Sequence, residues 1–145
     1  MILVDSNVLV AVFDDRDALA RQARLLWEGL RRSGTDLVFL DCVVDEVVSV
    51  LCRRFEQRKR LAEWPAAHRK MCDFFSRDKI SWVYSEVERL YDEILDLVAR
   101  HEGCLNFHDA LISLVARERG IGQIVSFDTD FDQIAWLTRI SDAGV

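Results

Sequence analysis

Ile2-Leu3-Val4-Asp5 places three apolar residues directly before a carboxylate at the start of the chain. A short, uninterrupted apolar run is typical of a strand that is buried on both faces of a parallel sheet. Three further runs have the same character, and a fifth strand is expected close to the C-terminus. These predicted strands cover residues 2–4, 37–40, 80–83, 124–127 and 135–140.

Segments with helical periodicity lie between the predicted strands. They cover residues 17–32, 41–55, 61–76, 87–99 and 106–119. Asp41 is expected to cap the second of them. Apolar strands that alternate with helices indicate a three-layer α/β/α fold with a parallel, about five-stranded central sheet. The 145 residues, half of them apolar, suffice for one such domain over residues 1–145.

The net charge of −6 is unusual for a protein that binds nucleic acid, but it is unevenly distributed. The segment 53–60 carries a net charge of +4, which leaves −10 for the rest of the chain. Its cations are Arg53, Arg54, Arg58, Lys59 and Arg60. Two interpretations stay open: phosphate contacts along a substrate path, or the solvated end of a helix whose dipole favours cations.

Neither a signal peptide nor a membrane segment is expected. The first residues lack a basic region and reach a carboxylate at Asp5, and the longest apolar runs fall far short of the ~20 residues that span a bilayer. The cysteines form no Cys-x-x-Cys pair and the histidines complete no zinc spacing. We therefore expect a cytoplasmic protein with reduced thiols.

Asp5 and Asp128 directly follow the predicted strands 2–4 and 124–127. Because the carboxyl ends of parallel strands meet at the edge of the sheet where ligands bind, the two carboxylates are expected to lie close together. A charge beside a buried strand costs free energy unless it is paired or bound. The alternative for each aspartate is that it caps the turn or helix that follows.

Glu46 and Asp109 add two acids in the first turns of helices that begin near strand ends. Glu46 lies at the margin of the apolar face of helix 41–55, whereas Asp45 points away from that face. Glu46 could still be an ordinary boundary residue. Asp109 lies three residues after Asn106, so a role in capping is the alternative for it.

A shared site for the four acids favours a hard cation. Clustered carboxylates repel one another unless a cation joins them, and their oxygen atoms suit Mg²⁺ or Mn²⁺. Such ions stabilise phosphodiester hydrolysis and generate the attacking hydroxide. A calcium loop starting at Asp128 is excluded, because its sixth position is Gln133 rather than glycine. The chain also lacks a glycine-rich phosphate loop and a G-x-S-x-G nucleophile turn.

The acid motifs, taken in this order, resemble those of PIN domains, particularly the toxin ribonucleases of VapC type. The resemblance extends over essentially the whole chain. It rests on residues 2–9, on Glu46 in its valine-rich helix, on residues 108–112 and on residues 124–131. Each motif alone is short, but the four in order are fairly specific.

The resemblance implies metal-dependent endonucleolytic cleavage of RNA by an activated water. It implies that Asp5, Glu46, Asp109 and Asp128 hold Mg²⁺ or Mn²⁺, with Asp130 as an additional or substitute ligand. Asn7 and Ser126 match polar positions that support the acids. His108, next to Asp109, is expected to be structural, because adjacent helical residues point about 100° apart.

Three functions stay in competition. The leading one is the ribonuclease toxin of a toxin–antitoxin pair, for which the resemblance also implies a homodimer and an antitoxin partner. The second is a PIN nuclease that acts on other RNA or on DNA in processing or repair. The third is a non-catalytic PIN-like module that binds RNA or a protein, against which the complete set of acids argues.

Overall fold

Five parallel strands form one sheet in the order β3-β2-β1-β4-β5. The computed structural model describes residues 1–142. The strands are β1 (Ile2–Val4), β2 (Leu37–Leu40), β3 (Ile80–Ser81), β4 (Gln123–Val125) and β5 (Thr138–Ile140). Leu3 pairs with Val38 on one side and with Ile124 on the other, so β1 is the central strand. The predicted α/β fold with a parallel five-stranded sheet is confirmed.

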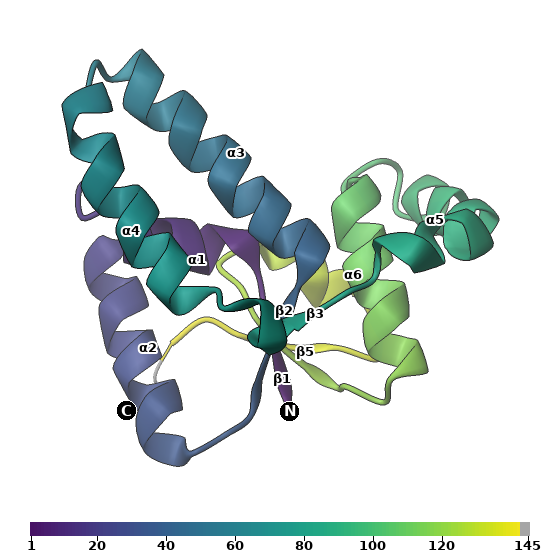
Figure 1. Ribbon diagram of the computed structural model, residues 1–145. Helices are drawn as coiled ribbons and strands as arrows, with labels where there is room; N and C mark the ends of the chain where they lie inside the picture. Colours follow the sequence, from purple (N-terminus) through teal and green to yellow (C-terminus); the bar gives the residue numbers. More distant parts are fainter. Residues whose placement is uncertain (143–145) are drawn as a thin grey trace.

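Within residues 1–142, six α-helices connect the strands: α1 (Ser6–Phe13), α2 (Ala20–Ser33), α3 (Asp41–Gln57), α4 (Trp64–Phe74), α5 (Val87–Arg100) and α6 (Phe107–Glu118). Four short 3₁₀ helices lie among them: η1 (Leu61–Glu63), η2 (Arg77–Lys79), η3 (Tyr84–Glu86) and η4 (Thr129–Gln133). Figure 1 shows α1, α2 and α4 on one side of the sheet and α5 and α6 on the other. Within residues 1–142, no helix is both long and apolar enough to cross a membrane.

The sequence did not predict helix α1. Its segment, Ser6 to Phe13, is buried at nearly every position, so apolar residues do not alternate with polar ones at a helical period. Two other predictions need correction. Leu40, not Asp41, is the N-cap of α3. The helix expected over residues 61–76 is divided into η1 and α4, with Pro65 in the first turn of α4, where proline is tolerated.

Strand β3 ends at Ser81, two residues earlier than the sequence predicts. The reason is a carboxylate from the neighbouring strand end. Asp41 accepts hydrogen bonds from the backbone amides of Val83 (3.0 Å) and Tyr84 (3.1 Å), so these amides are not available for the sheet. The chain then turns through η3 into α5.

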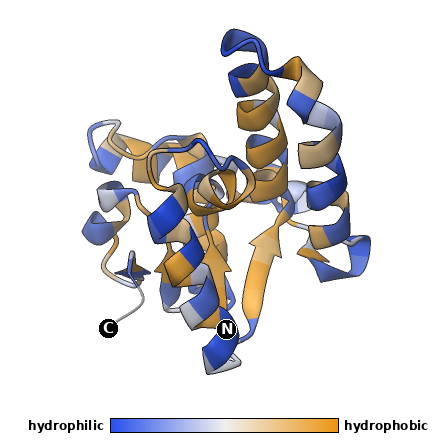
Figure 2. Cartoon of the chain, turned by 90° about the vertical axis from the view of Figure 1, so that its left-hand side faces the viewer, coloured by the Kyte–Doolittle hydropathy of each residue, from blue (hydrophilic) through white to orange (hydrophobic). Residues whose placement is uncertain are grey.

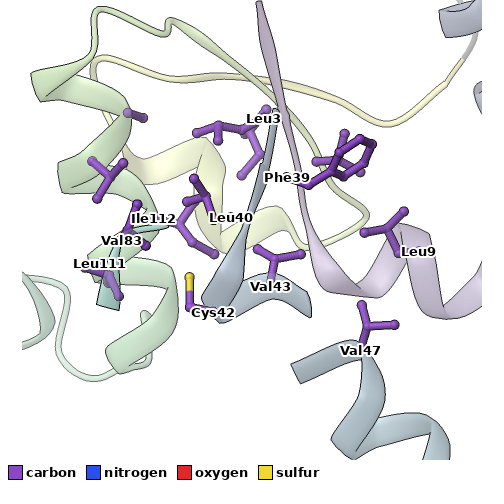
Figure 3. Packing of buried hydrophobic residues seen from close by; sticks show 14 of the residues in the cluster. Leu3, Leu9, Phe39, Leu40, Cys42, Val43, Val47, Val83, Leu111 and Ile112 are labelled. Atoms are coloured by element: carbon purple, nitrogen blue, oxygen red, sulfur yellow. The ribbon is translucent and has the colours of Figure 1, made fainter. Parts of the chain in front are cut away.

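The hydrophobic core lies between the sheet and both helical layers. Figure 3 shows side chains from β1, β2, α1, α3 and α6 converging there, among them Leu3, Leu40 and Ile112. In Figure 2 the strands in the middle of the sheet are mostly hydrophobic, whereas the turn that joins α3 and α4 is hydrophilic. Burial of each such aliphatic side chain stabilises the fold by about 1.5–3 kcal/mol. The core thereby holds the carboxyl ends of the strands, and the residues that follow them, in fixed positions.

Candidate active site

Asp5 begins the site at the carboxyl end of the central strand. Its carboxylate accepts hydrogen bonds from the backbone amide of Ser6 (2.6 Å) and from the hydroxyl of Ser126 (2.6 Å). The first contact caps α1, so the capping alternative considered for Asp5 is real. Asp5 is only 4% exposed, and among residues 1–142 it forms no ion pair with a cation. Capping therefore explains the position of Asp5 but leaves its charge without a counter-ion.

The Ser126 hydroxyl connects the residues after β1 with those after β4. While donating to Asp5, it accepts hydrogen bonds from the Asn7 side-chain amide (3.1 Å) and from the backbone amide of Asp128 (2.9 Å). The side-chain oxygen of Asn7 in turn accepts from the backbone amide of Phe127 (3.1 Å). Asn7 and Ser126 thus lie where supporting residues for Asp5 and Asp128 were expected.

Asp128 and Asp130 follow β4 in the same turn. One carboxylate oxygen of Asp128 accepts a hydrogen bond from the backbone amide of Asp130 (2.9 Å) and so caps η4. Both side chains are half-buried. Asp130 also receives a long contact of 3.4 Å from the Gln133 side chain.

Asp109 and Glu46 come from the N-terminal turns of α6 and α3. Asp109 forms a reciprocal capping box with Asn106: the Asn106 backbone amide donates to the Asp109 carboxylate (3.0 Å), and the Asp109 amide donates to the Asn106 side chain (3.0 Å). Glu46 is half-buried, whereas its neighbour Asp45 is exposed and accepts a hydrogen bond from the Tyr84 hydroxyl (2.8 Å). The contrast expected between Glu46 and Asp45 is therefore present.

The pKa values of the buried acids show that these carboxylates occupy one region. Burial raises the pKa of Asp5 to about 7, although the hydrogen bonds from Ser126 and Ser6 lower it. The negative charges of Asp109 and Glu46 add to the rise. Burial likewise raises the pKa of Asp109 to about 6, and the charges of Asp128, Glu46 and Asp130 contribute. The ionised forms of Asp5 and Asp109 are therefore disfavoured by burial and by the negative charges of the neighbouring acids.

The donor set fits a hard divalent cation. It consists of carboxylate oxygens from four different parts of the chain, and within residues 1–142 none of these carboxylates forms an ion pair. A cation would offset the mutual repulsion of these carboxylates and the cost of burying the charges of Asp5 and Asp109. The side chains do not form a ready-made cage: in the described part of the chain, no three His, Cys, Asp or Glu side chains are close enough to ligate one ion.

The basic stretch 53–60 is divided between exposed and buried cations: Arg53, Arg58 and Lys59 are exposed, whereas Arg54 is half-buried and Arg60 is buried. Arg60 is 8% exposed, and its guanidinium binds the buried carboxylate of Asp14 (2.8 Å) and that of Glu63 (2.8 Å). Arg54 forms ion pairs with Asp14 and Asp17, and Arg58 lies 3.8 Å from the Asp14 carboxylate.

This ion-pair cluster joins the α3–α4 turn to the end of α1. Because Arg54 and Arg60 are committed to these carboxylates, phosphate contact is no longer a fitting role for them. Arg53 and Lys59 are exposed and form no ion pair within residues 1–142, and Arg58 is exposed as well, so both interpretations of the stretch stay open for these three.

The sequence analysis did not predict the contacts of two buried carboxylates, Asp41 and Asp14, which hold segments next to the candidate site in place. Asp41 was expected only as a helix cap, yet it fixes the segment that leaves β3 through the amides of Val83 and Tyr84. Asp14 was not singled out, although it is fully buried and holds three arginines of the α3–α4 turn. The sequence contains a pattern that could have identified Asp14 as a buried acid, because it directly follows the apolar run from Val8 to Phe13.

A parallel sheet in the order 3-2-1-4-5 with carboxylates gathered at its carboxyl edge defines an α/β protein with an acidic ligand-binding edge. The family model of the PIN domain matches residues 2–137, nearly the entire chain, and the chain belongs to this family. The PIN-domain resemblance of the acid motifs is thereby confirmed.

The chain is also similar to a solved structure of VapC type. This is VapC20 of Mycobacterium tuberculosis, described as a Sarcin-Ricin loop cleaving toxin. The TM-score is 0.67 at 26% sequence identity, and the match covers 93% of this chain and 95% of that one. A search of curated proteins finds no match. The chain is accordingly a PIN domain of VapC type, a family of nucleases.

Proposed function

We propose that this protein is a metal-dependent endoribonuclease and acts as the toxin of a toxin–antitoxin pair. The observation that carries the proposal is the gathering of Asp5, Glu46, Asp109 and Asp128 at one edge of the sheet without a basic partner in the described residues. The PIN family and the likeness to VapC20, a Sarcin-Ricin loop cleaving toxin, support it.

Asp5, Glu46, Asp109 and Asp128 would hold Mg²⁺ or Mn²⁺, with Asp130 as a further ligand. A bound ion of this kind lowers the pKa of a water molecule and screens the charge of the scissile phosphate. Hydrogen bonds within the chain orient two of these carboxylates. The Ser126 hydroxyl donates to one oxygen of Asp5, and the Asn106 backbone amide donates to one oxygen of Asp109. The helix N-termini of α1 and α6 place both carboxylates at the sheet edge.

The hydrogen bonds of Ser126 argue against a covalent nucleophile at this edge. Ser126 is fully buried, and its hydroxyl proton is already donated to Asp5. No Ser–His or Cys–His pair is found beside the acids within residues 1–142; the Cys72–His68 contact of 3.6 Å lies on α4. The attacking group we propose is therefore water, and the acids act through binding and orientation.

The test is cleavage of a mixed RNA substrate by the purified protein in Mg²⁺ or Mn²⁺, compared with EDTA. We expect Asp5→Asn to reduce cleavage by at least about 100-fold, because loss of a ligand exceeds the effect of losing a supporting contact. Asp92→Asn, an exposed acid on α5, is the matched control and should cleave like the wild type. Equal cleavage in EDTA and in Mg²⁺, or by Asp5→Asn and the wild type, would overturn the proposal.

The partners we propose are a cognate antitoxin, an RNA substrate and a second copy of this chain. Co-expression with the product of a short neighbouring gene tests the first. An antitoxin should co-purify with the protein and suppress cleavage, and it should not suppress cleavage by an unrelated ribonuclease.

A further inference from the structure

Two large aromatic side chains are exposed where the chain leaves β3. Trp82 is 56% exposed and Tyr84 is 46% exposed, whereas Val83 between them is fully buried. Figure 3 shows Val83 in the core, near Cys42 and Leu111. The backbone turns at Val83 (φ −129°, ψ −8°), directly before η3 begins at Tyr84. Val83 thus anchors the segment while both rings are presented outward.

The segment that carries the rings is held firmly. The buried carboxylate of Asp41 accepts hydrogen bonds from the backbone amides of Val83 and Tyr84, and also from that of Cys42 (2.9 Å) at the start of α3. The Tyr84 hydroxyl donates to Asp45 on α3 (2.8 Å), which fixes the far end of that ring. The rings are therefore preorganised for a ligand, since little conformational entropy would be lost on binding.

A cation accompanies the first ring. The guanidinium of Arg77, in η2, lies 5.7 Å from the centre of the Trp82 ring. Arg77 forms no ion pair within residues 1–142, so it is available to a phosphate. Aromatic faces combined with unpaired arginines are how proteins bind single-stranded nucleic acid, through stacking on the bases and contact with the backbone.

The rings lie on the side of the sheet edge that carries the acids. β3 is separated from β1 by β2 alone, which places its carboxyl end about 10 Å from that of β1. Tyr84 contacts Asp45, and the next residue of α3 is Glu46, one of the candidate metal ligands. A single strand of RNA bound at the acids could extend over the N-terminus of α3 to these rings.

We propose that Trp82 and Tyr84, with Arg77, form a base-stacking subsite for the single-stranded RNA that flanks the bond to be cleaved. This inference rests on the proposed function, since it deepens the same site. It assigns the aromatic pair to RNA rather than to a second copy of the chain, because the Arg77 guanidinium lies over the Trp82 ring and the Tyr84 ring is held by Asp45, the residue before the candidate ligand Glu46.

The test measures RNA binding separately from cleavage. In the Asp5→Asn background, a fluorescein-labelled single-stranded RNA of mixed sequence is titrated with protein in Mg²⁺. We expect Trp82→Ala and Tyr84→Ala each to raise the Kd about tenfold, and Trp82→Phe, which keeps an aromatic face, to restore most of the affinity. Tyr91→Ala is the matched control, since Tyr91 is an aromatic residue on α5 that is 50% exposed.

The outcomes separate this subsite from the proposed function. Unchanged RNA affinity in Trp82→Ala and Tyr84→Ala overturns the subsite, even if the wild type cleaves RNA. Stacking without cleavage by the wild type overturns the proposed function and leaves the subsite standing. Loss of a dimer in Trp82→Ala by gel filtration, with RNA affinity unchanged, assigns the rings to a protein interface instead. Circular dichroism of each variant confirms that it is folded.

Discussion

Ser126 connects three other residues of the candidate site through a single hydroxyl group. Its single hydroxyl donates to Asp5 and accepts from Asn7 and from the backbone amide of Asp128. A hydroxyl has one proton and two lone pairs, so all of its hydrogen-bonding capacity is in use. Because the residue is fully buried, water cannot replace these contacts when the hydroxyl is removed.

We expect Ser126→Ala to destabilise the protein by about 1–3 kcal/mol, since the change leaves buried polar groups without partners. Cleavage should fall as well, because Asp5 loses the contact that orients one of its oxygens. Ser113 provides the control: it is also fully buried, but its hydroxyl has no hydrogen-bond partner among residues 1–142. Urea unfolding should show little change for Ser113→Ala. Equal losses in the two variants would contradict the role given to Ser126.

The residues of the candidate site could be predicted where a strand pattern locates them. Asp5 and Asp128 follow apolar runs that end at the sheet edge, so their neighbourhood follows from topology alone. The partners of Arg60 could not be predicted in this way. Arg60 and Asp14 are 46 residues apart, and neither lies at the end of a predicted strand, so only the tertiary fold brings their side chains together.

At the scale of elements, the helix N-termini serve two purposes at once. Asp5 and Asp109 each cap the helix that they begin or enter, and each points a buried carboxylate at the sheet edge. The two interpretations of these residues are therefore compatible, because a carboxylate that caps with one oxygen has a second oxygen for another ligand. Experiments must separate the two roles.

Asn106 and Asp109 allow this separation within one capping box. Asn106→Ala removes the cap and should cost about 1 kcal/mol of stability while leaving cleavage within a few-fold of the wild type. Asp109→Asn keeps an oxygen that can accept from the Asn106 amide, but it removes the charge that a cation needs. We expect near-normal thermal stability and loss of cleavage. If the loss of cleavage instead parallels the decrease in melting temperature in both variants, capping is the only role of Asp109.

The elements themselves were predicted unevenly, for a physical reason. Helix α5 shows a clear apolar stripe because only one face is buried, and the periodicity located it to within one residue. Helix α1 is covered by α2 and α3 as well as by the sheet, so its sequence is apolar on nearly all sides and carries no helical period. Burial on every side thus removes the signal that sequence analysis uses.

At the scale of the whole molecule, the arginines that contact Asp14 and the acids without an ion pair lie in different parts of the fold. The ion-pair cluster around Asp14 includes Arg54, Arg58 and Arg60 of the stretch 53–60. Burial of Asp14 acts to raise its pKa, but the hydrogen bonds from Arg60 and Arg16 and the charges of Arg60 and Arg54 together lower it. The acids at the sheet edge lack such partners in the described residues. The folded protein therefore holds a destabilising charge cluster that a divalent cation would relieve.

This cluster predicts an unusual pH dependence of stability for the metal-free protein. The pKa of Asp5 is about 7 in the folded protein and close to the ordinary value of 3.8 when unfolded, and the pKa of Asp109 is shifted in the same direction to about 6. Between pH 3.8 and about pH 7, the folded state binds more protons than the unfolded state, so the free energy of unfolding decreases as pH rises. Asp5 alone would account for a loss on the order of 3 kcal/mol.

In EDTA, we expect the melting temperature to be higher at pH 5 than at pH 8. Acids with lowered pKa values, such as Asp14 and Asp132, act in the opposite direction, but they do so only below about pH 4 and outside this range. Asp5→Asn should flatten much of the slope, whereas Asp92→Asn should leave it unchanged. A wild-type melting temperature that stays level or rises from pH 5 to pH 8 would contradict the clustering of buried, unpaired carboxylates. Because the measurement needs neither substrate nor antitoxin, it tests the acidic site independently of any activity.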